Sequence, residues 1–267
     1  VVRLRRWLDL DADPLLVDGA LASDAALAPL VAARPGLRIP GTTDPFELAV
    51  RAVLGQQVSV AGARTLAGRL VAAYGAPDRG VGDSAGDRGL LLFPSAATLA
   101  AAGPDRLREI GLTGARAATL AGLAGAVAGG LLLSPDADRR DVRTALLALP
   151  GIGPWTANYI ALRALGDPDA FPAGDRVLRK ALAALPVLVG QAGVDGPAGN
   201  PGPPGDAPEG SGGRAVDAAT ATARAAGWRP WRGYAAQHLW SAWAGRPPGA
   251  ASENRERVSV RPGEDIG

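Results

Sequence analysis

Apolar residues recur at helical spacing along most of this chain. Spacings of three and four residues put them on one face of a helix, where they can be buried together. The stretches with this spacing are 45–75, 95–102, 104–110, 113–129, 139–149, 155–165, 175–184, 214–226 and 231–244. The pattern predicts a mainly α protein, and Asp44 followed by Pro45 predicts a sharp start for the first long helical stretch.

The first residues of the chain depart from this spacing. Residues 1–10, VVRLRRWLDL, alternate apolar and polar positions, which is typical of a strand. A single strand is not stable alone in water. Residues 1–12 are therefore predicted to be the terminal strand of a truncated N-terminal antiparallel β domain.

Two polar segments show no period. Residues 189–213, VGQAGVDGPAGNPGPPGDAPEGSGG, are rich in Gly and Pro and predict a disordered insertion. Residues 246–267 predict a flexible tail. The helical domain is accordingly expected over 13–188 and 214–245.

The composition excludes several kinds of chemistry. The 267 residues include no Cys and one His, His238, so a thiol nucleophile and a Cys or His metal site are not expected. The net charge of +2 permits nucleic-acid binding without arguing for it. Since the sequence shows neither a long apolar run nor a signal peptide, a cytoplasmic protein is expected. The chain starts VVRLRRW without Met, which suggests a piece of a longer polypeptide.

The turn LPGIGPWTANY, residues 149–159, separates two helical stretches. Gly151 and Gly153 lack a Cβ, so they can adopt positive φ and admit a close backbone approach. The free N–H groups of the turn and of the next helix start would point outward together, which suits a phosphate oxygen. A plain corner between two helices is the alternative interpretation.

Asp175, in AFPAGDRVLRKAL, directly precedes a short helical stretch. Its side chain is expected to cap that helix, and the helix dipole and free N–H groups would keep the carboxylate ionised at neutral pH. Asp167 and Asp169 lie nearby in a loop with no helix behind them. Trp155 and Tyr159 are four residues apart and share one helix face, either as core or as an aromatic wall.

The string LPGIGPWTAN resembles the helix-hairpin-helix motif of the DNA base-excision glycosylase superfamily. Three further stretches, DPFELAVRAVLGQQVSVAGARTLAGRLVAAYG, IGLTGARAATLAGLAGAV and GWRPWRGYAAQHLW, are similar to its alkylation-repair branch, the DNA-3-methyladenine glycosylase II family. The resemblance covers about 1–185 and 214–245. It implies the helical domain of that superfamily, with only a remnant strand of the N-terminal antiparallel β domain.

The resemblance also implies roles for single residues. Asp175 would be the catalytic carboxylate, and Trp155, Tyr159 and Trp240 would line the pocket of a flipped base. Residues implied to contact DNA are Gly151, Ile152 and Gly153 of the hairpin, Gln56, Gln57 and Arg176, with Arg64, Arg116 and Arg179 as further phosphate candidates. Gln57 stands where some relatives insert an apolar wedge into the duplex.

No cofactor would be required in such a protein. The carbonyls of Leu147, Leu149 and Ile152 would offer a site for a monovalent cation, Na⁺ or K⁺. Family members that also cut the strand have a lysine where this chain has Trp155, and its only Lys, Lys180, lies five residues after Asp175. The resemblance therefore implies a monofunctional enzyme.

The function expected from this resemblance is hydrolysis of the N-glycosidic bond of alkylated bases, 3-methyladenine and related ones, leaving an abasic site. Two alternatives stay open: a glycosylase for oxidised or mismatched bases, and a non-catalytic helix-hairpin-helix module that only binds DNA. The expected partner is double-stranded DNA with alkylated bases. A nucleoid-associated monomer is expected, with a regulatory domain fused upstream in the full polypeptide and no membrane contact.

Overall fold

The computed structural model describes residues 1–78, 90–185 and 215–246. The predicted insertion 189–213 lies outside the described residues, and so does all of the predicted tail except Arg246.

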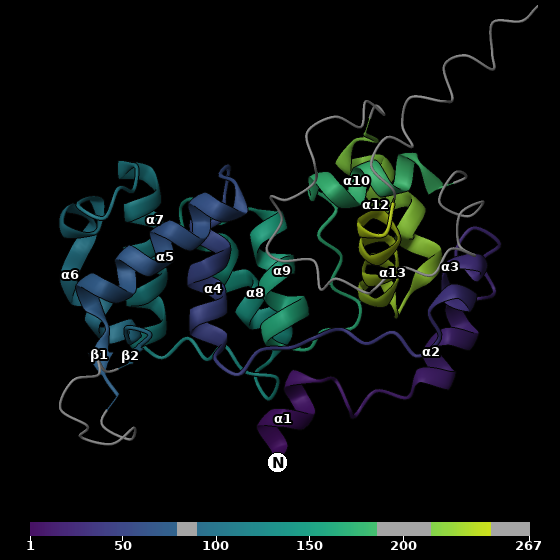
Figure 1. Ribbon diagram of the computed structural model, residues 1–267, viewed down its shortest axis with the longest axis horizontal. Coiled ribbons are helices and arrows are strands. Elements are labelled where there is room, and N and C mark those ends of the chain that lie inside the picture. The colour runs from purple at the N-terminus through teal and green to yellow at the C-terminus, as the bar shows by residue number, and fades with distance from the viewer. Residues whose placement is uncertain (79–89, 186–214, 247–267) are drawn as a thin grey trace, which may run out of the picture.

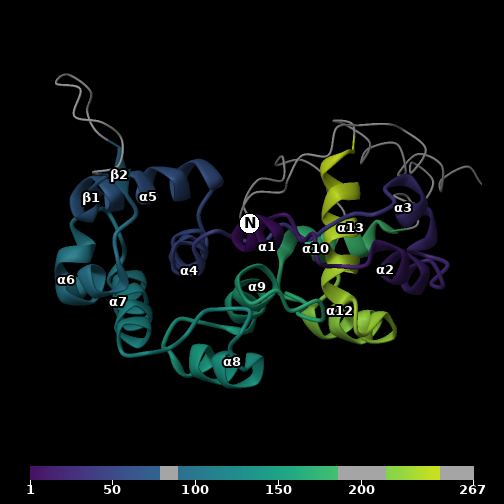
Figure 2. The same ribbon diagram turned by 90° about the horizontal axis from the view of Figure 1, so that it is seen from below.

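Two groups of helices lie side by side, joined by extended segments (Figure 1). The first group contains α4 (Pro45–Leu54), α5 (Val60–Tyr74), α6 (Ala96–Arg108), α7 (Gly114–Ala128), α8 (Arg139–Ala148) and α9 (Pro154–Ala164). The second contains α2 (Pro14–Leu21), α3 (Ala28–Ala33), α10 (Arg176–Ala183), α12 (Ala218–Arg224), the 3₁₀ turn η1 (Ala225–Trp228) and α13 (Arg232–Ala244). The view turned by 90° separates the same two groups, with α1 (Val2–Trp7) between them (Figure 2). The predicted mainly α fold is confirmed.

Side-chain caps explain where most of these helices begin. An Asp, Ser or Thr oxygen accepts an N–H of the first turn, which would otherwise have no partner. The capping residues are Asp13, Asp44, Ser59, Ser95, Thr113, Asp138, Asp175 and Asp217. The helix start predicted at Asp44-Pro45 is confirmed.

The long stretch 45–75 is two helices rather than one. The first, α4, ends at Leu54, and Ser59 caps a new start at Val60. Between them Gln57 has φ +56°, a left-handed conformation that is rare for a residue with a side chain. The break places the loop 55–59 at the end of α4.

The predicted N-terminal strand is wrong. Residues Val2–Trp7 form the helix α1, which buries none of its residues. A strand needs a neighbour to take up its backbone hydrogen bonds, whereas a helix satisfies them locally. Within the described residues, the only strands are β1 (Ala76–Pro77) and β2 (Leu91–Leu92), and they pair antiparallel with each other.

One continuous core runs through both groups of helices. Helix α9 packs against α4 and α8, and α10 packs against α13. Polar contacts fix the segment after α9, because Arg232 forms a bidentate pair with Asp169 at 2.7 and 2.8 Å. The amide of Gly233 donates to the Pro168 carbonyl at 2.8 Å. These contacts set where the chain enters α10.

None of the described helices combines the length and the apolar character that crossing a bilayer would need.

Candidate active site

The turn between α8 and α9 is a tight hairpin. The amide of Ile152 donates to the Leu149 carbonyl at 3.1 Å, and the Ile152 side chain is buried in the core. Pro154 is the first residue of α9. Gly153 is the N-cap residue, and it has no side chain that could accept an N–H of the first turn. The Ile152 amide is thus used inside the turn, which differs from the prediction that it would face DNA.

The two glycines of the hairpin serve different purposes. Gly151 has φ +85°, and a Cβ there would come within 1.9 Å of Thr119 Oγ1. Gly153 has φ −91°, and a Cβ there would meet nothing within 4 Å. The prediction of positive φ therefore holds for Gly151 alone. The fold requires Gly151, whereas it leaves the space beside Gly153 open.

The hairpin presents several backbone donors. Within the described residues, the amides of Gly151, Gly153 and Trp155 make no hydrogen bond to the backbone. Gly151 is exposed and Gly153 half-buried. Successive free N–H groups at a helix start form an anion-binding concavity.

Gln56 holds the hairpin from the neighbouring loop. Its Nε2 donates to the Gly151 carbonyl at 3.1 Å and to Thr156 Oγ1 at 3.0 Å. Arg116 in turn donates to the Gln56 carbonyl. Gln56 and Arg116, expected at the DNA, are thus engaged within the protein. Exposed Gln57, beside Gln56, projects from the same loop.

Asp175 is the N-cap of α10 and is only 1% exposed. Its Oδ1 accepts the Leu178 amide at 2.7 Å and the Trp240 indole N–H at 3.0 Å. Its Oδ2 is buried and has no hydrogen-bond partner in the described residues. The cap predicted from the sequence is confirmed, and one carboxylate oxygen remains uncommitted.

Burial raises the pKa of the Asp175 carboxyl, and this effect outweighs the opposing hydrogen bonds from Leu178 and Trp240. The Trp155 indole N–H also lowers that pKa, although it lies outside hydrogen-bonding geometry and is itself buried and unpartnered. The sequence predicted the lowering effect of the helix start but not the larger effect of desolvation.

Aromatic rings surround this carboxylate. Trp155 and Tyr159 stack with centroids 5.8 Å apart and planes at 19°. The residue before the carboxylate, Gly174, lies against Trp155, since a Cβ there would be 3.2 Å from Trp155 Cβ. Burial raises the pKa of Tyr159, and the charge of Asp175 acts in the same direction.

Trp240 comes to the site from α13 and is buried. The sequence predicted it as a wall of the site, and the structure adds that its indole N–H holds Asp175. No local signal could have shown this contact, because the partners are 65 residues apart.

The other polar residues considered from the sequence either bind other groups in the protein or lie away from Asp175 Oδ2. Asp169 pairs with Arg232, and Asp167 accepts the Asp169 amide at 3.0 Å. His238 is buried without a hydrogen bond to a described residue, and burial lowers its pKa to about 4. Arg176, next to Asp175, is exposed.

Models of two protein families match this chain. The model of the HhH-GPD superfamily base excision DNA repair protein matches residues 50–191. The model of the AlkA N-terminal domain matches residues 1–44.

Curated relatives match most of the chain. A probable bifunctional transcriptional activator/DNA repair enzyme AlkA of Mycobacterium tuberculosis is 44% identical over 90% of this chain. The chain covers 42% of that relative's length. DNA-3-methyladenine glycosylase 2 of Escherichia coli is 34% identical over 90% of this chain and 70% of its own length.

A solved structure has a similar fold. The 3-methyladenine DNA glycosylase of Archaeoglobus fulgidus aligns with a TM-score of 0.66 and 22% identity, over 91% of this chain and 73% of its own.

Proposed function

Since the chain belongs to the HhH-GPD superfamily of base excision DNA repair proteins, we propose that it is a DNA glycosylase acting on alkylated bases. It would hydrolyse the N-glycosidic bond of 3-methyladenine and related lesions and leave an abasic site. The observation that carries this proposal is Asp175, a buried carboxylate with one fixed oxygen and one unpartnered oxygen beside a stacked aromatic pair.

A single carboxylate is sufficient for this reaction. An alkylated purine already carries positive charge, so when the bond from sugar C1′ to the base nitrogen breaks, the electron pair leaves with a neutral base. The sugar develops oxocarbenium character, and Asp175 Oδ2 supplies the opposing charge in a desolvated setting. Water then adds to C1′ and its proton passes to solvent, either directly or by way of the Asp175 carboxylate, which ends the cycle ionised as it began.

The aromatic pair supports a cationic base as substrate. Trp155 and Tyr159 stack, and Trp155 is half-buried, so the pair offers a π surface from its outer side. Cation–π attraction on such a surface contributes about 0.5–2 kcal/mol. Alkylated bases would therefore be favoured over neutral ones.

The hairpin would hold the DNA backbone. The amides of Gly151, Gly153 and Trp155 suit a phosphate oxygen, and the open space beside Gly153 lets a backbone approach. Gln57, exposed at the tip of the loop 55–59, would fill the gap left by the flipped base. Arg176 would contribute a phosphate contact next to the carboxylate.

The carbonyls of Leu147, Leu149 and Ile152 would hold a monovalent cation, Na⁺ or K⁺, under the hairpin. Hard oxygen donors suit such an ion, although the Leu149 carbonyl already accepts the Ile152 amide. The ion would add positive charge beside the phosphate. Duplex affinity should therefore fall when Na⁺ and K⁺ are replaced by a large organic cation at equal ionic strength, and unchanged affinity would contradict this site.

The decisive experiment is base release from methylated duplex DNA, with products separated by chromatography. Asp175→Asn should lower the excision rate by about 10²- to 10³-fold, because it removes the charge that stabilises the transition state. Asp167→Asn is the matched control, since it removes a nearby loop carboxylate and should excise normally. Duplex affinity, followed by fluorescence anisotropy, should be similar in all three proteins.

Each alternative predicts a different result. Unchanged excision by Asp175→Asn would remove the catalytic assignment. A wild type that binds duplex DNA and releases no base would favour the non-catalytic DNA-binding module. Release of oxidised or mismatched bases in place of methylated ones would favour the other glycosylase branch.

The reaction is proposed to stop at the abasic site, because this chain has Trp155 where the resemblance implies a lysine in strand-cutting family members. Damaged duplex should stay uncut until base or heat is added. A covalent adduct trapped by borohydride would contradict this proposal.

The remaining proposals concern the biological setting. The protein would act as a monomer on chromosomal DNA at the nucleoid. A regulatory domain fused upstream is proposed because the Mycobacterium tuberculosis relative is named as a bifunctional transcriptional activator and DNA repair enzyme. Sequencing the gene upstream of Val1 would test for that domain, and sedimentation of the purified protein would test the monomer.

A further inference from the structure

A second site lies at the opposite end of α9 from the hairpin. A cavity of about 400 Å³ opens between α1, the segment 39–45 and the end of α9. Residues on its wall include Arg3, Thr42, Ser134, Arg139, Arg163 and Tyr234. Asp175, the stacked aromatic pair and the hairpin do not line it, so the cavity is separate from the proposed reaction centre.

Arg163 is the unusual residue of this wall. It is only 8% exposed, and its Nε is buried without a hydrogen-bond partner among the described residues. No carboxylate of the described residues forms an ion pair with its guanidinium. A buried cation without a counter-ion is costly, and an anion entering the cavity would remove that cost.

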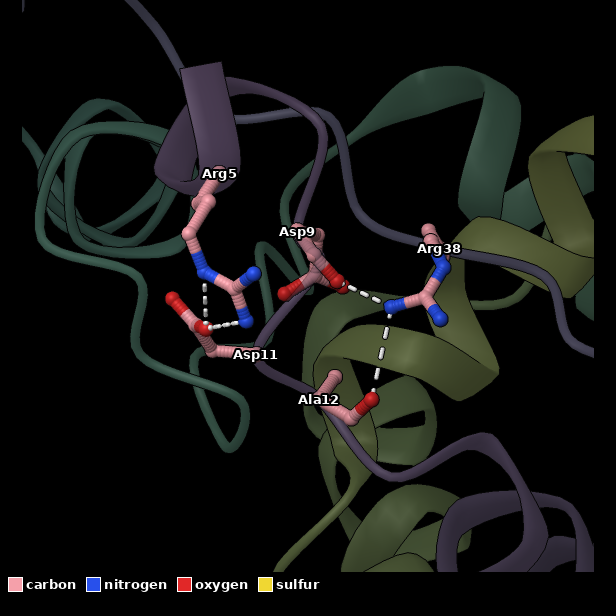
Figure 3. Close-up of polar contacts among 5 residues, drawn as sticks. All are labelled: Arg5, Asp9, Asp11, Ala12 and Arg38. Atoms are coloured by element: carbon pink, nitrogen blue, oxygen red, sulfur yellow. Dashed lines mark hydrogen bonds and ion pairs between the residues drawn. The ribbon is translucent and has the colours of Figure 1, made fainter. Parts of the chain in front are cut away.

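The acidic groups of the wall are engaged elsewhere. Arg5 and Asp11 both line the cavity, and Arg5 Nε donates to Asp11 Oδ1 at 2.8 Å (Figure 3). Asp9 Oδ2 accepts the Ile39 amide at 3.0 Å and the Tyr234 hydroxyl at 2.8 Å. Neither aspartate neutralises Arg163.

The backbone around these aspartates is also held in place. Arg38 donates to the carbonyls of Asp9 and Ala12 (Figure 3). Asp9 itself has φ +53°, a conformation that needs such support. The backbone that carries Asp9 and Asp11 is therefore held in place without a ligand.

Further positive charge faces the cavity. Arg3, on α1, is exposed and forms no ion pair with a described residue. Arg139 donates to the Gly166 carbonyl at 3.3 Å and keeps its charge. Arg3, Arg139 and Arg163 thus place positive charge around this cavity without an ion pair to any described carboxylate.

We propose that this cavity binds a small phosphate-bearing ligand, either inorganic phosphate or a small phosphate ester. The guanidinium of Arg163 would bind two phosphate oxygens at once, a geometry that this planar group favours. The positive charges of Arg3 and Arg139 would help to balance the two negative charges of a phosphate dianion. Asp175, Trp155 and Tyr159 are not among the residues that line this cavity.

The test is isothermal titration calorimetry with inorganic phosphate at constant ionic strength, supported by thermal unfolding with and without phosphate. Wild type should bind, and phosphate should raise its unfolding temperature. Arg163→Gln should weaken phosphate binding by about tenfold or more, since a charge-assisted bidentate contact is lost. Arg106→Gln on α6 is the matched control, because it removes an exposed arginine remote from the cavity and should bind like wild type.

A second variant distinguishes a loss of phosphate binding from misfolding of the protein. Arg3→Gln changes an exposed side chain, so it should fold normally and still weaken phosphate binding. Without phosphate, Arg163→Gln should unfold at a temperature equal to or above that of wild type, because an unpaired buried charge is gone. Phosphate binding that is absent in wild type, or unchanged in both variants, would overturn the proposal.

Competition distinguishes the sources of the phosphate. Glycerol phosphate should displace inorganic phosphate if the ligand is a small ester, and failure to displace it would restrict the site to the free ion. Undamaged duplex DNA should leave phosphate binding unchanged. Displacement by duplex would assign the cavity to the DNA-binding surface and overturn a separate small-ligand site.

Discussion

The hairpin and the Asp175 site meet at the start of α9, yet they are built in opposite ways. In the hairpin, the inward-facing groups have partners: Gln56 binds the Gly151 carbonyl, and Ile152 binds the Leu149 carbonyl. At the other site, Asp175 Oδ2 and Trp155 Nε1 are buried and have no hydrogen-bond partner in the part of the chain that the structure describes. The inward-facing groups of the hairpin are thus hydrogen-bonded, whereas the Asp175 site holds unpartnered polar atoms at a cost in stability.

This difference shows that two neighbouring groups of residues can divide the work, with the hairpin proposed to bind DNA and the Asp175 site proposed to stabilise the reaction. A rigid hairpin presents outward amides without changing shape. A buried carboxylate with one free oxygen is ready to stabilise positive charge, because no donor among the described residues binds that oxygen. Substitutions in the hairpin should therefore affect stability or DNA affinity, and substitutions at the Asp175 site should affect the reaction.

The largest effect is expected at the hairpin. Gly151→Ala should lower the free energy of unfolding by about 3 kcal/mol or more, because the new Cβ collides with Thr119 in a strained backbone conformation. Gly153→Ala should leave stability unchanged and weaken duplex binding, since the methyl group fills the open space. Chemical denaturation and fluorescence anisotropy measure the two effects. Equal stability losses in both variants would remove the distinction between the glycines.

The next effect concerns the support of the carboxylate. Trp240→Phe keeps an aromatic ring and removes the indole N–H that donates to Asp175. The pKa of Asp175 should rise further, so excision should fall by about tenfold at neutral pH, as expected for the loss of one hydrogen bond to a charged group. The acidic limb of the pH–rate profile should shift to higher pH. The control is Trp243→Phe on the same helix, which has no bond to Asp175 and should leave the profile unchanged.

A stability measurement tests the cost of the buried carboxylate. Because burial raises the pKa of Asp175, this group contributes stability in acid that is lost as pH rises through its folded-state pKa. Asp175→Asn should therefore be more stable than wild type at pH 7, by roughly 1 kcal/mol, as expected for an unsatisfied buried group. The difference should shrink as the pH falls toward the ordinary pKa of aspartate. Thermal unfolding of both proteins across this pH range measures the difference. If Asp175→Asn gained more stability over wild type in acid than at pH 7, the raised pKa of Asp175 would be contradicted.

The smallest effect is expected at the loop beside the hairpin. Gln57→Gly should raise the free energy of unfolding by less than about 1 kcal/mol, because glycine adopts positive φ without strain but gains freedom when unfolded. Excision should fall at the same time if Gln57 fills the gap in the duplex. Gln57→Asn is the matched control, since it tolerates the conformation and keeps a polar side chain. Unchanged excision in both variants would remove the wedge role.

The sequence predicted the parts of the molecule that depend on neighbours in the chain. Helical periods and the cap at Asp44 each follow from contacts within a few residues. The capping role of Asp175 was readable for the same reason. The strand predicted over 1–10 failed because a short alternating pattern cannot show whether a neighbouring strand exists.

Only the tertiary structure decided which of these groups meet and in what surroundings. Gln56 reaches the hairpin across 95 residues and Trp240 reaches Asp175 across 65, and no periodicity reports such separations. The direction of the Asp175 pKa depends on burial by several elements at once. The unpaired charge of Arg163 likewise exists only because distant segments close around it. Local geometry was therefore determined by the sequence itself, whereas burial and long-range pairing required the folded chain.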